Sequence, residues 1–367
     1  MNTLLINKED LRHNVNIINK LAKQTDENYK IIAVVKGNGY GLGLVEYSKF
    51  LIDNGIDFLA VATIEEALEL RKSGIEEKIL MLSSTSIKED IEALVENDII
   101  LSIGSKETAE IANNIGQKMN KNVKAHLKID TGMGRYGFLY SELEDIKDVI
   151  EANKNIKFEG VFSHFSIAYY ENNKWTKQQY QNLINVINFL EKNNINFDFK
   201  HICNSTGFLL YKNMRLNCAR IGSAFLGRAA INNNGFKRIG YIKTNIKEIR
   251  NLPKGYNISY LNTYKTKKET RVGIIQIGYI DGINIETSQD MFRFVDKLRT
   301  FYHAAKDLIR KKKITVMINE KRYPVLGKIG MYHMVIDITD TNIKLNDEVL
   351  LNVNTLHIDS KVRREFV

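Results

Sequence analysis

Short apolar runs rich in β-branched residues alternate with amphipathic stretches between residues 31 and 228. A short buried run is typical of a strand, and apolar residues spaced three and four apart indicate a helix. Strands that alternate with helices predict βαβ units and a parallel sheet. Eight such runs favour a (β/α)8, TIM-like barrel of the α/β class over an open sheet. They cover residues 31–35, 58–62, 79–82, 99–103, 124–129, 158–162, 198–202 and 218–225.

The pattern changes after Arg228, where strand-like runs follow one another closely. These runs cover residues 240–249, 270–277, 313–318, 323–329, 334–338 and 348–353. Both prolines, Pro253 and Pro324, fall in this part, and one helical pattern over 289–313 interrupts it. We therefore expect a barrel at 8–232 and a mainly β C-terminal domain at 233–367, with the strand-like N-terminal segment 1–7 joining the β domain.

The composition is that of an ordinary soluble globular chain, with 367 residues, 44% of them hydrophobic and 26% charged. No apolar run approaches the ~20 residues of a membrane span, and the N-terminus lacks the pattern of a signal peptide. We therefore expect a cytoplasmic protein with no membrane partner. The two cysteines, Cys203 and Cys218, are too few for a disulfide framework or a metal site, so buried free thiols and no bound metal are expected.

The formal charge of +10 comes from lysines dispersed along predicted helix faces. Only residues 310–313 form a basic run, and no aromatic residues are interleaved with it. A solvated helix end explains this run better than a nucleic-acid patch does. We expect no nucleic-acid partner, and the basic balance favours anionic small molecules.

Lys36 stands at the end of the first predicted strand and is followed by the glycine-rich segment 37–43. Apolar neighbours disfavour the ammonium form and lower the pKa of a lysine, and a neutral amine can attack an aldehyde. The glycines allow the backbone to approach a bulky planar ligand, and Tyr40 lies within reach of the same place. The alternative is that Lys36 only marks the exit of the strand into solvent.

Polar residues also stand at the ends of four further predicted strands. They are Lys128 with Arg135, His164, Asn204 with Ser205, and Arg220 with Gly222 and Ser223. Singly, each has an ordinary explanation: His164 as a core histidine, Arg135 in a salt bridge with Asp130, Ser205 as a helix cap. Arg220, however, interrupts a strand that lines a packed interior, where a charge needs a dedicated partner. Because active sites of such barrels lie at the C-terminal ends of the strands, we expect one shared pocket.

The contents of this pocket suggest pyridoxal phosphate. Ser205, Gly222 and Ser223 follow the seventh and eighth strands, where such barrels commonly bind phosphate. Lys36 offers an imine, and the cofactor's ring acts as an electron sink. Arg220 does not give up its proton easily, so facing the ring nitrogen it would keep that nitrogen unprotonated. This favours simple removal and return of a proton over other reactions.

With these residues the chain resembles the alanine racemases, the barrel-fold class of pyridoxal phosphate enzymes, over nearly its whole length. The resemblance rests on segments 34–41, 126–135 and 201–205, of which the second is the longest and most specific. Segments 220–222, 258–260 and 277–282 extend it.

The resemblance implies a role for each site residue. Lys36 and Tyr260 would be the catalytic acid/base pair on opposite faces of the substrate, with Tyr260 supplied by the β domain of the partner in a head-to-tail homodimer. A monomer would then be inactive. The remaining assignments are as follows: Arg135 on the ring hydroxyl and substrate carboxylate, steadied by an often carbamylated Lys128; Arg220 on the ring nitrogen with His201 behind it; His164 supporting the Tyr260 side; Tyr40, Asn204, Ser205, Gly222 and Ser223 around the phosphate; Met331 at the substrate; and Tyr279 in support.

The chain departs from the family at four places. Residues 330–333 read Gly-Met-Tyr-His instead of Cys-Met-Asp-Gln, and Leu261 follows Tyr260 where the family has glycine. The C-terminus lacks a segment with a further phosphate-contacting tyrosine, and 289–313 is an insertion. Segment 330–333, the insertion and the ending 359–366 resemble the racemase domain of vancomycin-resistance serine racemases. The expected substrate is therefore alanine, with serine, as a source of D-serine for peptidoglycan precursors, as the alternative. An apolar pocket rejects an added hydroxyl by only about a hundredfold.

Three other functions stay open as rivals. A non-catalytic pyridoxal phosphate protein would need only the barrel, and a pure binding protein would have no use for Tyr260. A basic amino-acid decarboxylase of similar fold would offer a cysteine–aspartate pair, which is not seen at residues 330–331.

Overall fold

The computed structural model describes residues 2–229, 235–285, 294–309 and 314–367. The chain divides into two compact units, Lys8–Ile239 and a second unit formed by Met1–Asn7 with Gly240–Val367. We call them the barrel unit and the β unit. The domain boundary expected between residues 232 and 233 lies outside the described residues.

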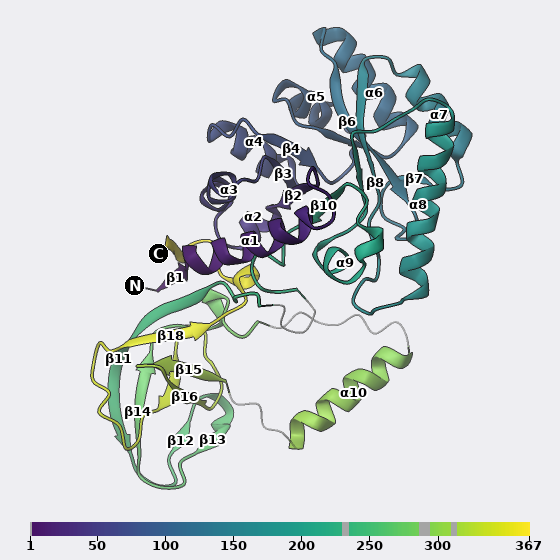
Figure 1. Ribbon diagram of the computed structural model, residues 1–367. Helices are drawn as coiled ribbons and strands as arrows, with labels where there is room; N and C mark the ends of the chain where they lie inside the picture. Colours follow the sequence, from purple (N-terminus) through teal and green to yellow (C-terminus); the bar gives the residue numbers. More distant parts are fainter. Residues whose placement is uncertain (1, 230–234, 286–293, 310–313) are drawn as a thin grey trace. The chain divides into compact units, whose positions relative to one another are not determined.

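The barrel unit contains the eight parallel strands that the apolar runs predict (Figure 1). Their order is β4-β3-β2-β10-β9-β8-β6-β5, and a bridge between Leu80 and Ile100 links the two end strands, so the barrel is nearly closed. The predicted fold class is confirmed. The strands are β2 (Lys30–Val34), β3 (Phe58–Val61), β4 (Lys78–Met81), β5 (Leu101–Ile103), β6 (Val123–Asp130), β8 (Ile156–Phe162), β9 (Phe199–His201) and β10 (Cys218–Ile221), with the short β7 (Phe138–Leu139) beside β6.

Helices cover the outside of these strands, and side-chain caps fix where several of them begin. Thr63 accepts a hydrogen bond from the Glu66 amide at the start of α4, and Ser105 accepts one from the Thr108 amide at the start of α6. The helices are α1 (Lys8–Lys23), α2 (Lys36–Tyr40), α3 (Leu44–Asp53), α4 (Ile64–Lys72), α5 (Lys88–Glu96), α6 (Lys106–Met119), α7 (Leu143–Ala152), α8 (Lys174–Lys192) and α9 (Ser205–Leu210), followed by the 3₁₀ turn η1 (Lys212–Met214).

Alternate residues of the strands fill the barrel interior. Ile32 and Val34 on β2 pack with Phe58 and Ala60 on β3 and with Cys218 on β10. Burial of each large apolar side chain contributes about 1.5–3 kcal/mol, so this cluster fixes the relation between the strands whose ends carry the polar residues. Cys203 and Cys218 are both buried and free, as expected.

The β unit is built on an eight-stranded sheet of order β14-β17-β16-β15-β18-β11-β1-β19, and a pairing of β11 with β14 closes part of it into a ring. β1 (Thr3–Ile6) pairs antiparallel with β11 and parallel with β19. The other strands are β11 (Tyr241–Leu252), β14 (Thr270–Ile275), β15 (Thr315–Ile318), β16 (Lys321–Leu326), β17 (Met334–Asp337), β18 (Glu348–Asn352) and β19 (Arg363–Phe366).

Smaller elements of the β unit carry its candidate site residues. The hairpin of β12 (Asn257–Ile258) and β13 (Tyr264–Lys265) encloses the 3₁₀ turn η2 (Tyr260–Asn262), and η3 (Tyr279–Asp281) follows β14, while η4 (Thr355–His357) lies near the C-terminus. The helix expected within 289–313 is present as α10 (Phe294–Ile309), and residues 286–293 and 310–313 lie outside the described part. None of the helices in the described ranges is long and apolar enough to cross a bilayer.

Candidate active site

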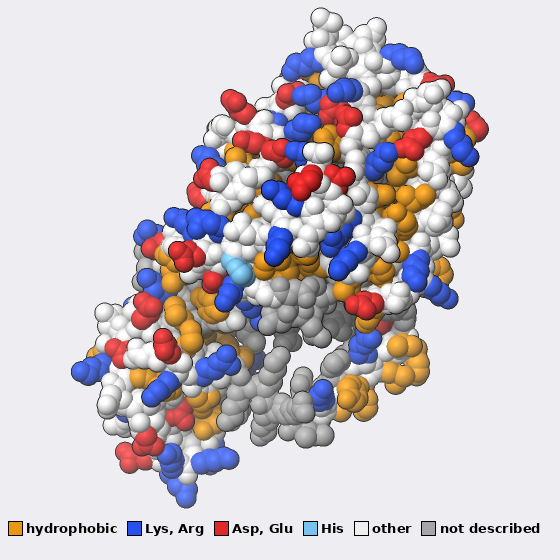
Figure 2. Space-filling model, viewed as in Figure 1, with side chains coloured by type: hydrophobic (Ala, Val, Ile, Leu, Met, Phe, Trp, Pro, Cys, Tyr) orange, Lys and Arg blue, Asp and Glu red, His pale blue; other side chains and the backbone are white. Residues whose placement is uncertain are grey.

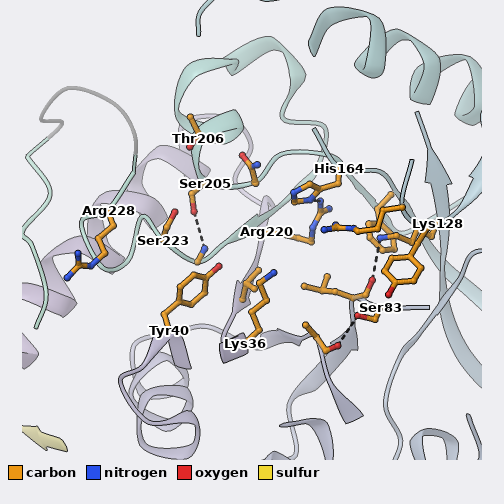
Figure 3. A pocket seen from close by; sticks show the side chains of 18 of the residues that line it. Lys36, Tyr40, Ser83, Lys128, His164, Ser205, Thr206, Arg220, Ser223 and Arg228 are labelled. Carbon is orange, nitrogen blue, oxygen red and sulfur yellow. Dashed lines mark hydrogen bonds between the residues drawn. The ribbon is translucent and has the colours of Figure 1, made fainter. Parts of the chain in front are cut away.

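A cavity of about 540 Å³ opens at the C-terminal ends of the barrel strands (Figure 3). Five cationic side chains line it, and no carboxylate does among the described residues. Such a lining suits a ligand with several negative charges, because cation–anion hydrogen bonds are roughly twice as strong as neutral ones. The five are Lys36, Lys128, Arg135, Arg220 and Arg228.

Lys36 lies at the entry of α2, directly after β2, and points into this cavity (Figure 3). Burial lowers its pKa, Arg135 and Arg220 act in the same direction, and Glu66 opposes them. Glu66 Oε1 accepts hydrogen bonds from the amides of Gly37 at 2.6 Å and Asn38 at 3.1 Å. The segment after Lys36 is thereby fixed, and the amine loses its proton more readily than an exposed lysine does.

The turn that follows Lys36 winds left-handed. Gly37, Asn38 and Gly39 have φ values of 65°, 53° and 62°. Glycine adopts this region without a steric penalty, and asparagine tolerates it better than most residues do. The Asn38 carboxamide oxygen also accepts a hydrogen bond from the Leu44 amide at 2.9 Å. The glycines are therefore required by the shape of the turn that carries the lysine.

Hydroxyl groups gather at the side of the cavity next to the C-terminal ends of strands β9 and β10. Tyr40, whose pKa burial raises to about 12, keeps its proton and approaches Gly222 so closely that a Cβ there would lie 2.4 Å from its Oη atom. Ser205 Oγ accepts hydrogen bonds from the amides of Gly222 and Ala224, at 3.1 and 3.2 Å. Ser223 and Thr206 also line this side, which we call the hydroxyl corner.

The helix cap expected as an alternative at Ser205 is instead made by its neighbour. Asn204 Oδ1 accepts a hydrogen bond from the Gly207 amide at 2.9 Å, which starts α9, and Asn204 also lines the cavity. The Ser205 hydroxyl therefore contacts the loop after β10 instead of capping α9.

Arg220 is buried, and each hydrogen-bond acceptor found for it is a backbone carbonyl or an imidazole nitrogen. It donates to His201 Nδ1 at 2.5 Å, to Ser163 O at 2.7 Å and to His164 Nδ1 at 3.1 Å. Burial lowers its pKa to about 10, which leaves the guanidinium charged at neutral pH. In the described part of the chain, this buried charge therefore has no carboxylate partner and remains available to a ligand.

The hydrogen bonds behind Arg220 define where the histidine protons are. A guanidinium only donates, so His201 and His164 accept at Nδ1 and carry their protons on Nε2. His201 Nε2 then donates to Nδ1 of His126, 2.9 Å away, and His126 is left with an Nε2–H group that is buried without a partner in the described structure. Burial first, and then Arg220, lower the pKa of all three histidines, to about 3 for His126, so these rings are neutral.

The loop with Arg135 is ordered by a carboxylate, though by a different contact from the salt bridge considered above. Asp130 accepts hydrogen bonds from the amides of Gly132 and Met133, both at 2.8 Å, and of Arg135 at 3.1 Å. Partial burial raises the pKa of Asp130, but these backbone hydrogen bonds outweigh it and lower the pKa. The Arg135 side chain is left to line the cavity.

Lys128 stands deeper in the same cavity. Its Nζ atom lies 4.2 Å from the centre of the Phe162 ring and 3.3 Å from the carbonyl oxygen of Leu82. Burial, followed by Arg220 and Arg135, lowers its pKa to about 7. A substantial share of neutral amine is therefore present at neutral pH.

Several residues of the site were not found from the sequence, among them Thr206, Glu66 and Arg228. Glu66 is in the first turn of α4, and only its position just after a predicted strand could have suggested it. Arg228 lines the cavity and donates to Ile239 O at 3.2 Å, but in the sequence it marked only the end of the barrel pattern.

Tyr260, Tyr279 and Met331 belong to the β unit and are not among the residues that line the barrel cavity. They form a group of their own. A Cβ on Gly330 would lie 3.3 Å from the Tyr260 ring, and the Tyr279 amide donates to Gly330 O at 3.1 Å. Tyr260 itself is 68% exposed. The structure thus places the predicted barrel residues around one cavity. The predicted residues of the β unit lie together in a separate group.

Comparison with known proteins identifies the chain. The family models for the N-terminal and C-terminal domains of alanine racemase match residues 6–230 and 240–362. An alanine racemase of Methanococcus maripaludis is 34% identical over 348 residues, which cover 93% of this chain and 86% of that protein. One of Clostridium novyi is 32% identical over 355 residues, which cover 94% and 84%. The solved structure of an alanine racemase of Clostridium difficile 630 has a TM-score of 0.84 and 29% identity, and the match covers 99% of this chain and 95% of that one.

The barrel with its cationic cavity, the β domain and these matches define a racemase, an isomerase that uses pyridoxal phosphate. The chain belongs to the alanine racemase family.

The cavity fits this cofactor. The hydroxyl corner and Gly222, where no side chain would fit beside Tyr40, leave room and donors for a phosphate group. A lysine with a lowered pKa stands beside it, and a buried arginine with only neutral acceptors faces the same space.

Proposed function

We propose that the protein interconverts the L and D forms of a small amino acid, in the first place alanine. The observation that carries the proposal is that the amine of Lys36, the guanidinium of Arg220 and the hydroxyl corner meet in one cavity. Among the residues that the structure describes, no carboxylate lines this cavity. The named relatives are alanine racemases, which supports alanine as the substrate.

Each barrel residue has a place in this proposal. Tyr40, Asn204, Ser205, Gly222 and Ser223 would hold the phosphate, and Arg220, with His201 behind it, would hold the ring nitrogen. Lys36 would hold the cofactor through its amine, Arg135 would hold the ring hydroxyl and the substrate carboxylate, and Lys128, carbamylated or neutral, would steady Arg135. When bound, pyridoxal phosphate supplies an electron sink for negative charge at the substrate Cα.

Inversion at Cα needs one group that takes a proton from one face and another that gives a proton to the other. Lys36 serves one face, and its lowered pKa brings the amine closer to working pH, where a general base is most effective. We assign the other face to Tyr260 of a partner subunit, with Met331 at the substrate, Tyr279 in support and His164 on the Tyr260 side. A head-to-tail homodimer would complete each site.

The decisive experiment is a racemisation assay on L-alanine, read by chiral chromatography. Lys36→Ala and Tyr260→Phe are each expected to abolish turnover, whereas Tyr256→Phe, an exposed tyrosine beside the same hairpin, is the matched control and keeps it. Full activity of Lys36→Ala would refute the proposal. Release of CO₂ instead of racemisation would favour a decarboxylase, and cofactor binding without turnover would favour a non-catalytic protein.

The dimer is tested by dilution. Activity is expected to fall in step with the dimer fraction measured by light scattering, and an active monomer would remove Tyr260 from the proposed mechanism. The cytoplasmic location expected from the sequence stays a prediction.

Serine is the second candidate substrate, and the position of Gly330 favours it. A side chain at 330 would press on the Tyr260 ring, so glycine leaves room beside the proposed catalytic tyrosine for one added hydroxyl. We expect measurable kcat/KM on L-serine, and a Gly330→Ala variant that loses more of its serine activity than of its alanine activity. An unchanged ratio would remove Gly330 from the explanation of specificity.

A further inference from the structure

Helix α10 carries large apolar side chains on its surface, and Figure 2 shows hydrophobic side chains over this part of the molecule. Phe294 is 72% exposed and Phe301 74% exposed, and Val295, Leu298 and Tyr302 are also exposed. Scattered single apolar residues are normal on a protein surface, but a contiguous apolar face indicates an interaction site.

The side chains on α10 follow an ordered pattern around its axis. With about 100° per residue, Phe301, Phe294, Leu298, Tyr302 and Val295 fall within an arc of roughly 120°. Lys297 lies just beyond one edge of this arc, and Arg299 and Lys306 lie just beyond the other. Asp296 lies nearly opposite the arc. Cationic groups thus flank the apolar face on both sides, and an acidic group occupies the far side.

The position of the cations beside the apolar arc of α10 helps to decide which partner covers this face. In a pair of α10 helices from two copies of the chain, flanking positions of one helix meet those of the other, so the cations would be brought together and repel. At a bilayer surface the same cations reach the phosphate groups of the lipids while the apolar arc enters the acyl boundary, because long basic side chains extend from an apolar stem. The net charge of +10 adds attraction to an anionic surface.

We propose that α10 docks the protein reversibly on the surface of a bilayer that contains anionic lipid. Docking of this kind places the helix in the plane of the interface and involves no spanning segment. It therefore replaces the expectation of no membrane partner, which rested on the lack of a span. The proposal concerns the β unit alone and is independent of the racemase reaction.

Vesicle flotation of the purified full chain tests the proposal. We expect binding to phosphatidylcholine vesicles that contain phosphatidylglycerol and little binding to pure phosphatidylcholine. Binding should weaken as NaCl rises from about 0.1 to about 1 M, where the screening length falls from about 10 to about 3 Å. The double variant Leu298→Asp/Phe301→Asp should bind at least roughly tenfold more weakly. Trp175→Asp, which changes a 61% exposed aromatic on α8, should bind as the unmodified protein does.

A fluorescence probe then reports on the helix itself. The chain has one tryptophan, so the variant Trp175→Phe/Phe301→Trp carries its only indole on α10. Its emission should shift to shorter wavelength with anionic vesicles and stay unchanged with neutral ones. The proposal is overturned if the unmodified protein does not float with anionic vesicles, or if the Asp variant binds them equally well. A smaller oligomer of the Asp variant with unchanged vesicle binding would likewise overturn it and assign the face to a second copy. Racemase activity in solution should be the same in all these variants.

Discussion

Gly160 on β8 leaves space for the imidazole of His126. This imidazole contacts His201, which in turn accepts a hydrogen bond from Arg220. A Cβ at residue 160 would lie 2.7 Å from the Cγ, Nδ1 and Cε1 atoms of that ring, far inside van der Waals contact. The ring is fully buried and cannot swing into solvent. We therefore expect Gly160→Ala to displace His126 and break its hydrogen bond to His201, so that Arg220 loses part of its support.

The size of the effect follows from two contributions. Forcing a methyl group into a packed interior costs about 1–3 kcal/mol, and loss of a buried hydrogen bond that leaves a polar group unsatisfied costs about 1–3 kcal/mol. Gly160→Ala should thus lower the free energy of unfolding by about 2–6 kcal/mol, measured by urea denaturation followed by circular dichroism.

A double-mutant cycle separates this mechanism from a general effect of alanine in a strand. In a His126→Ala background the obstructing ring is gone, so most of the cost of Gly160→Ala should disappear. An equal cost of Gly160→Ala in both backgrounds would refute the role of His126. Nitrogen NMR of the histidines adds an independent check, because His201 and His126 should both be protonated at Nε2.

The remaining predictions concern three other positions. Gly222→Ala should weaken pyridoxal phosphate binding in a spectroscopic titration by roughly tenfold or more, because its methyl group would meet the Tyr40 hydroxyl at 2.4 Å. Leu261→Gly should raise the free energy of unfolding by about 1 kcal/mol, because Leu261 holds a left-handed φ of 59°. The urea midpoint should rise accordingly, and an unchanged midpoint would contradict this strain. The folded-state pKa of Lys128 is lowered to about 7 from 10.5, so between these values the unfolded chain binds more protons and stability should rise with pH. Lys128→Met should lack this rise, and equal slopes would argue against the lowered pKa.

Several strands of the barrel could be predicted because they are short runs of buried apolar residues, as β2, β3 and β4 are. Their ends were less predictable: the apolar run 218–225 continues beyond Ile221, where the ladder of β10 stops, because those residues pack without strand pairing. The two-residue strands β12 and β13 are too short to show any periodicity.

The site was predictable where its residues lie near the C-terminal end of a strand, as Lys36 does after β2 and Arg220 does within β10. It was not predictable where function depends on contacts between distant parts of the chain. Glu66 meets the Gly37 and Asn38 amides only after α4 has packed. His126 was visible as part of a motif, but its link to Arg220 through His201 exists only in three dimensions.

The position of β1 has a consequence for the order in which the molecule is made. This strand is made before the barrel, yet its partners β11 and β19 lie beyond the whole barrel sequence, and the Val367 amide donates to Ile6 O at 3.0 Å (Figure 1). At about 5–20 residues per second, β1 waits tens of seconds for β19. The barrel can fold during synthesis, whereas the sheet of the β unit is completed only after β19 has been made. Loss of the last few residues would therefore remove β19, and β1 would keep only its pairing with β11.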